Sequence, residues 1–148
     1  MIYRKATVND MPAIVDIAVE SVSRNPLPVR IDRQAMMDTV KAALAPNHFC
    51  WVCEDEDKVV AAFVACTMPG FWFERQSCSV LLYYTRKPGR GIGLIREFAR
   101  WVKSRPAIKM AIFELEPDAD PRLVKLLVRL GFDRQSQNMT YVRGAKYV

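Results

Sequence analysis

At 148 residues the chain is long enough for one domain, and its 51% hydrophobic residues are sufficient for a full core. No apolar run approaches the roughly 20 residues that span a bilayer, and residues 1–10 lack the plan of a signal peptide, so we expect a cytoplasmic protein with no membrane partner. The formal net charge of +6 suits an anionic ligand, but the basic residues are scattered along the sequence, which disfavours nucleic acid.

The first third of the chain predicts one strand and two helices. Residues 2–6 alternate as a short strand, and Thr7 or Asn9 can cap a helix that follows. The two prolines of residues 24–28 indicate a loop. A second helix is expected over residues 31–44, because its apolar residues recur on one helical face before Pro46.

Three strands are expected next. Residues 48–54 and 58–67 read as strands joined by the charged turn at residues 55–57. Pro69 and Gly70 end the second strand, residues 71–76 form an aromatic loop or a strand start, and the third strand covers residues 76–85.

Cys50 and Cys53 form a C-x-x-C pattern inside a predicted strand. Strand residues three apart point to opposite faces, so this pair cannot share a metal ion without a turn. With His48 as the only histidine, we expect buried free thiols and no metal site.

The third strand runs into a loop with glycines at alternate positions, Gly89, Gly91 and Gly93, and an amphipathic helix then begins. A glycine-rich turn at a helix N-terminus is suited to phosphate, since free backbone N–H groups and the helix dipole both favour an anion. Arg86, Lys87 and Arg90 add positive charge. The G-x-G-x-G spacing fits neither the dinucleotide fingerprint nor the G-x-x-x-x-G-K-[ST] loop.

The rest of the chain predicts a strand over residues 108–115, a second helix and a closing strand. Asp120 and Pro121 form a helix start, and Gly131 ends that helix after a stripe of leucines. Residues 132–142 read as one strand or two. The order of elements indicates a single α/β domain over residues 1–148.

Two motifs carry a family resemblance. PGRGIG, residues 88–93, is similar to the R/Q-x-x-G-x-G pyrophosphate loop of the GNAT acetyltransferases, and LLVRLGF, residues 126–132, resembles the L-Y-E-K-L-G-F signature of their last helix. The order of elements resembles that superfamily from end to end. The resemblance implies an α/β fold (mixed α+β), with a splayed mixed sheet of about six or seven strands flanked by about four helices.

The resemblance also implies an acetyl-CoA-dependent N-acetyltransferase in which an amine attacks the thioester directly, with no metal. Acetyl-CoA would bind the strand before the loop, the loop itself, the helix start and the N-cap of the last helix. By number these are Leu82, Tyr83, Tyr84, Thr85, Pro88, Gly89, Arg90, Gly91, Ile92, Gly93, Leu94 and Asp120.

Two residues depart from the family pattern. Pro88 stands where Arg or Gln is usual, unless the loop is aligned from Arg86 instead, and Leu127 stands where a tyrosine often protonates the departing thiolate. Tyr83, Glu74 and Tyr141 are the remaining candidates for proton transfer.

The sequence does not specify the acceptor amine, which can be a small molecule, a lysine or a protein N-terminus. A homodimer is also compatible with the sequence. Two other functions compete with the enzyme reading. One is a CoA-binding module with impaired catalysis, indicated by Leu127. The other is a basic adaptor that docks on nucleic acid or a ribosome, which would need its Lys and Arg side chains on one face.

Overall fold

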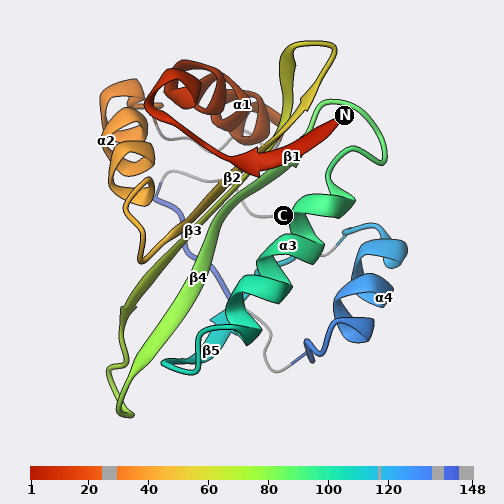
Figure 1. Ribbon diagram of the computed structural model, residues 1–148. Coiled ribbons are helices and arrows are strands. Elements are labelled where there is room, and N and C mark those ends of the chain that lie inside the picture. The colour runs from red at the N-terminus through yellow and green to blue at the C-terminus, as the bar shows by residue number, and fades with distance from the viewer. Residues whose placement is uncertain (25–29, 117, 135–138, 144–148) are drawn as a thin grey trace.

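The computed structural model describes residues 1–24, 30–116, 118–134 and 139–143 (Figure 1). Their strands form one five-stranded sheet in the order β1-β2-β3-β4-β5. The first four strands pair antiparallel, and β5 runs parallel to β4. The strands are β1 (Ile2–Lys5), β2 (Phe49–Asp55), β3 (Lys58–Pro69), β4 (Gln76–Thr85) and β5 (Ile108–Ile112).

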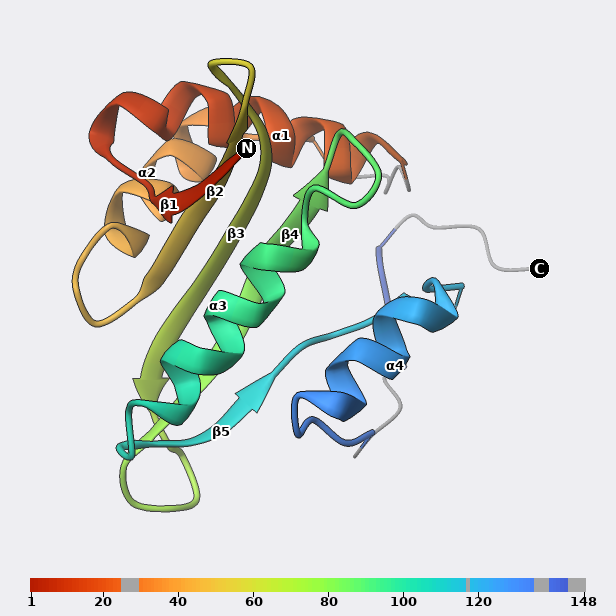
Figure 2. The same ribbon diagram turned by 45° about the vertical axis from the view of Figure 1, so that its right-hand side comes forward.

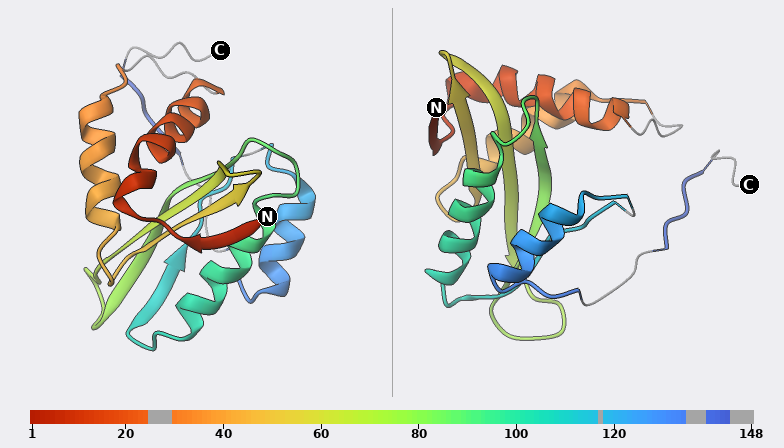
Figure 3. Two further views of the ribbon diagram at one scale, coloured as in Figure 1. Left: turned by 45° about the horizontal axis from the view of Figure 1, so that its top comes forward. Right: turned by 90° about the vertical axis from the view of Figure 1, so that its right-hand side faces the viewer.

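Helices cover both faces of the sheet (Figures 2 and 3). A 3-10 turn, η1 (Val8–Asp10), leads into α1 (Met11–Arg24), which packs with α2 (Arg33–Ala43) on one face. The opposite face carries α3 (Ile92–Lys103) and α4 (Pro121–Arg129). Phe98 of α3 lies fully buried among aromatic rings, so this second face holds the aromatic core.

Local signals in the sequence account for most element boundaries. Asp10 accepts hydrogen bonds from the Thr7 N–H at 2.8 Å and from the Arg4 guanidinium, which fixes the start of α1. Asp32 accepts from the Ala35 N–H and caps α2. Glu56 and Asp57 both adopt positive φ, +52° and +62°, and form the two-residue turn between β2 and β3.

Cys50 and Cys53 lie on opposite faces of the sheet. Cys50 packs in the cluster under α1 and α2, and Cys53 packs in the cluster under α3 and α4. The prediction that these thiols point apart is therefore confirmed, and the four cysteines are free.

The sheet is smaller than the sequence predicts. The described residues contain five strands rather than six or seven, and β5 ends at Ile112, before the predicted end at residue 115. Residues 132–134 and 139–143 form no strand, and residues 139–143 stand apart from the sheet (Figure 3, right). Residues 135–138 fall outside the described residues, as do residues 25–29, which contain all of the predicted loop at 24–28 except Arg24, the last residue of α1.

No helix within the described ranges is long and apolar enough to cross a membrane.

Candidate functional site

The strand β4 has one edge that is only partly paired. Along β3 it pairs over its whole length, from Gln76 to Thr85, but along β5 it pairs only from Gln76 to Ser79. Leu81 has no partner in β3, since Val80 pairs with Ala65 and Leu82 with Val64, so a bulge lies where the two strands part. A bulge bends its strand and increases its twist. The bulge therefore accounts for the opening between β4 and β5 beyond residue 79.

Strand alternation identifies the backbone N–H groups that face the open edge of β4. The Arg86 N–H donates to the Val60 carbonyl of β3 at 2.8 Å. Because successive residues of a strand direct their N–H and C=O groups to opposite sides, the N–H groups of Tyr83 and Thr85 face away from β3. Among the described residues they have no strand partner on this side, where β4 and β5 separate.

A tight turn joins β4 to α3. The Arg90 N–H donates to the Lys87 carbonyl at 3.2 Å, and Gly89 adopts φ +77°. Proline at the second position and a positive-φ glycine at the third are typical of a type II turn. The proline that departs from the family pattern thus has a local role, since it presets this turn. A Cβ at Gly89 would meet nothing within 4 Å.

The other two glycines of the loop are required by packing. A Cβ on Gly91 would collide with the Tyr83 hydroxyl, and a Cβ on Gly93 would collide with the Tyr3 ring. Neither residue has a positive φ. Tyr83 from β4 and Tyr3 from β1 therefore hold the N-terminus of α3 close against the sheet.

The start of α3 presents free backbone donors to the open edge of β4. The Leu94 N–H donates to the Gly91 carbonyl at 3.0 Å, so the helical ladder begins there. The N–H groups at the first positions of a helix have no partner within the helix, and the helix dipole places partial positive charge beside them. Ile92 is half-exposed at this end, whereas Leu94 is buried and contributes only its backbone.

The cations of the loop are already paired with carboxylates. Arg86 contacts Glu20 of α1 at 2.9 Å, and Arg90 and Lys87 both contact Asp55 of the β2–β3 turn, at 3.0 Å and 3.5 Å. The hydrogen bond from Arg90 is the main cause that holds the pKa of the Asp55 carboxyl below its usual value. An anion at this loop would therefore depend mainly on the backbone amides.

Tyr83 is the one sequence-predicted proton-transfer residue that lies beside the loop. Its ring packs between Phe63 and Phe113, with centroids 5.7 Å and 5.8 Å away. Desolvation by this burial raises the pKa of Tyr83 to about 12. The phenol is therefore protonated at neutral pH and can donate a hydrogen bond, but it cannot act as a base.

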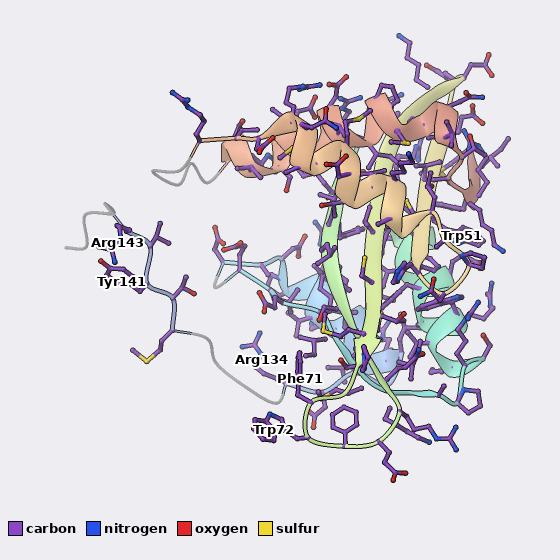
Figure 4. The ribbon with its side chains drawn as sticks, turned by 90° about the vertical axis from the view of Figure 1, so that its left-hand side faces the viewer. Trp51, Phe71, Trp72, Arg134, Tyr141 and Arg143 are labelled. Carbon is purple, nitrogen blue, oxygen red and sulfur yellow. The ribbon has the colours of Figure 1, made fainter. Side chains whose placement is uncertain are left out.

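Glu74 and Tyr141 are not brought to the loop. Glu74 is exposed in the hairpin that precedes β4, at the opposite end of that strand from Thr85. Tyr141 is 73% exposed and contacts Arg143, on the segment that stands apart from the sheet (Figure 4). His48 accepts from the Thr67 N–H at 3.0 Å and fastens the start of β2 to β3.

The remaining sequence-predicted residues divide between the two faces. Leu82 and Tyr84 pack on the α1–α2 face, where Arg24 lies over the Tyr84 ring. Asp120 accepts from the Arg122 N–H at 2.9 Å and pairs with its guanidinium, which is the main cause of the lowered pKa of Asp120. Leu127 is buried in the core under α3 and α4.

Sequence reasoning missed the partners of the loop. Tyr83 contacts Gly91 across the turn, while Tyr3 with Gly93 and Asp55 with Arg90 join residues far apart in the chain, and no local pattern signals any of these contacts. Within the described part of the chain, no group of three or more His, Cys, Asp or Glu side chains could hold a metal ion.

Comparison with solved structures identifies the fold. A predicted acetyltransferase from Clostridium acetobutylicum, solved with acetyl-CoA, is 17% identical and superposes with a TM-score of 0.73 over 95% of this chain and 94% of its own. A ribosomal-protein-alanine N-acetyltransferase from Brucella melitensis is 20% identical, with a TM-score of 0.72 over 92% of this chain and 86% of its own.

An aminoglycoside acetyltransferase from a soil metagenome, solved with sisomicin, is 12% identical, with a TM-score of 0.67 over 98% of this chain and 96% of its own. No protein-family model and no curated protein matches the sequence. The chain has the fold of the GNAT acetyltransferases, as its glycine loop and last helix indicated.

Proposed function

We propose that this chain is an acetyl-CoA-dependent N-acetyltransferase. The observation that carries the proposal is the open edge of β4, residues 80–85, which leads directly to the free amides at the N-terminus of α3. An extended ligand can add to a free strand edge through backbone hydrogen bonds, and a diphosphate suits a helix N-terminus. Acetyl-CoA, which has an extended pantetheine arm and a diphosphate, matches both features in the same order.

Each part of the site has a role in this proposal. Residues 82–85 of β4 hold the pantetheine arm, and the amides of residues 89–93 hold the diphosphate. The Tyr83 N–H, which faces the gap, donates to the thioester carbonyl and stabilises the negative charge that develops on its oxygen. Pro88 and Gly89 set the turn, and Tyr83 and Tyr3 fix the position of α3 through their contacts with Gly91 and Gly93.

The reaction is a direct transfer. The lone pair of the acceptor amine forms the new C–N bond at the thioester carbon, the C–S bond breaks, and the thiolate of CoA leaves while the amine loses one proton. Burial raises the pKa of Cys50 and Cys78 to about 12, so neither thiol supplies a nucleophilic thiolate at neutral pH. A tyrosine that could protonate the leaving group is replaced by the buried Leu127.

Exposed apolar side chains favour an acceptor with an apolar group beside its amine. These side chains lie on the sheet face that also carries α1 and α2. Ser77 of β4 pairs with Met68 of β3 on one side and with Met110 of β5 on the other, and Ser79 pairs with Ile112 of β5. Met68, Met110, Ile112 and the bulged Leu81 are each 37–51% exposed. A polycationic acceptor would need carboxylates here, so an apolar amine or a peptide fits better.

Release of free CoA tests the proposal. The purified chain is mixed with acetyl-CoA and a panel of amines, including phenylethylamine, a lysine peptide and a peptide with a free N-terminus, and thiol release is followed. We expect turnover that depends on the amine, with acetyl found on the amine nitrogen. An acetyl group trapped on any of the four cysteines would contradict direct attack.

A second candidate function is a CoA-binding module without catalysis, which the buried Leu127 favours. Calorimetric titration with CoA separates the two. Tight CoA binding without turnover of any amine would favour the module, whereas absence of CoA binding would contradict both readings of the glycine loop.

A further inference from the structure

The positive charge of this chain is concentrated in its second half. Residues 1–74 contain seven Lys and Arg against ten Asp and Glu, and residues 75–148 contain fifteen against six. The basic residues that look scattered in the sequence therefore give a net charge of −3 in one half and +9 in the other. The second half folds as β4, α3, β5 and α4, and the two helices lie on one face of the sheet.

The outer surfaces of α3 and α4 carry six of these fifteen cations. Together the two helices hold six Lys or Arg side chains and a single carboxylate, Glu97, which pairs with Arg100. Arg96, Arg100 and Lys103 follow each other at helical spacing and line a shallow groove of about 260 Å³ whose apolar lining is Ala99 and Leu130. Cations in the last turn of a helix are favoured by the helix dipole, which accounts for Arg100, Lys103 and Arg129. The dipole does not account for Arg96 and Lys125, which lie outside the last turns.

The β3–β4 hairpin lies at the end of the sheet where α3 ends and carries an exposed aromatic tip, whose rings project on the side of the hairpin away from α3 (Figure 4). Phe71 and Trp72 are 83% and 95% exposed at the end of the β3–β4 hairpin. The Gln76 N–H at the base of this hairpin donates to the Ala107 carbonyl at 2.9 Å, which joins it to the segment that follows α3. Figure 4 shows Phe71, Trp72 and Arg134 at the same end of the molecule.

The tip has a defined conformation. The Gly70 N–H donates to the Arg75 carbonyl at 2.9 Å, and Phe73 folds back against Gly70, where a Cβ would collide with it. Arg75 adopts φ +82°, which is rare for a residue other than glycine. Phe71 and Trp72 are thus held outward by an ordered hairpin.

We infer that the α3–α4 groove and the aromatic tip form a binding surface for single-stranded nucleic acid. A line of cations that tracks a phosphate backbone, with aromatic rings on which unpaired bases stack, is the usual construction of such sites. The cations extend along the side of α3 for about 10 Å from Lys103 to Arg96. A flexible strand can bend from that line around the end of the sheet to the tip, whereas a flat bilayer cannot contact both, and a second copy would present the same charge.

This surface is separate from the glycine loop. Lys103 and Leu130 lie at the C-terminal ends of α3 and α4, and the glycine loop lies at the N-terminal end of α3. The inference therefore does not rest on the proposed acetyl transfer, and urea unfolding serves as the check that variants remain folded.

Fluorescence anisotropy with labelled 20-residue oligo-U and oligo-dT tests the inference between 50 and 200 mM salt. With about five phosphates contacted, log K should fall with log salt with a slope of about −3.5, so affinity drops about 100-fold over this range. Equal affinity for both strands identifies the shared backbone and base stacking as the ligand, and a large preference for oligo-U identifies RNA.

Two matched variants locate the site. Arg96→Gln/Arg100→Gln/Lys103→Gln should reduce the slope by about 2, and Lys5→Gln/Lys41→Gln/Lys58→Gln, exposed cations on β1, α2 and β3, should change it little. Equal effects of the two triple variants would show that only net charge matters and would overturn the inference.

The aromatic tip is tested separately. Phe71→Ser/Trp72→Ser should weaken single-strand binding about 10-fold or more and leave duplex binding within about twofold. An equal loss on duplex, or no binding of either oligonucleotide at 50 mM salt, would overturn the inference. So would binding to vesicles of phosphatidylglycerol, or to polyglutamate, with an affinity above that for the oligonucleotides.

Discussion

A single carboxylate in the glycine loop should reveal whether CoA phosphates bind there. Gly89→Asp and Gly89→Asn form a matched pair, because both residues tolerate the φ of +77° found at this position and both enter open space. They differ by one negative charge. Gly91 is unsuitable, since any side chain there collides with Tyr83 and would disturb the fold as well as the site.

The expected loss follows from Coulomb's law. A carboxylate about 6 Å from one phosphate charge costs about 0.7–3 kcal/mol for an effective dielectric constant between 80 and 20, which is about a 3- to 100-fold loss in affinity. Calorimetric titration with CoA at low salt should therefore show weaker binding by Gly89→Asp than by Gly89→Asn. At about 1 M salt, where the Debye length is about 3 Å, most of the difference should disappear. Equal affinities of the two variants at low salt would refute a phosphate site at this loop.

Three further predictions concern the core and the chemistry. Phe98→Ala should cost about 3–5 kcal/mol in urea unfolding, and Leu130→Ala clearly less, because Phe98 is fully buried and Leu130 lines an open groove; similar losses would contradict this packing. Burial raises the pKa of Cys50 and Cys78 in the folded state to about 12, so stability is full below the unfolded pKa of about 8.5 and is lost as pH rises toward 12, by about 1–3 kcal/mol per pH unit. Urea unfolding in the presence of a reductant checks this, and Cys50→Ala/Cys78→Ala should flatten the alkaline slope. Leu127→Tyr and Leu127→Phe should both lose about 1–3 kcal/mol through overpacking, and the tyrosine variant should release CoA faster at neutral pH; equal rates would mean that the thiolate leaves without a proton donor.

Local signals in the sequence were enough to predict most of the fold. Alternation and turn residues predicted the bounds of β4. The glycine loop and the amphipathic pattern after it predicted α3, which begins within that loop at Ile92. Asp120 and Pro121 marked the start of α4 in the same way. These predictions succeeded because caps, prolines, glycines and periodicity act within a few residues. The strand predicted over residues 132–142 is wrong for its described residues, since a strand also needs a neighbouring strand to pair with and residues 139–143 stand apart from the sheet (Figure 3).

The character of the candidate site was decided only by the tertiary structure. The sequence shows alternating glycines, but only the fold shows why two of them must lack a side chain. A Cβ on Gly91 or Gly93 would collide with Tyr83 or Tyr3. The sequence shows three cations at the loop, but only the fold shows that they pair with Glu20 and Asp55, so that an anion bound at the loop would depend mainly on backbone amides. Cations that look scattered along the chain gather on α3 and α4 because helical spacing and the packing of the two helices bring them to one face. Such contacts join residues that are distant in the chain, so no local pattern could have specified them.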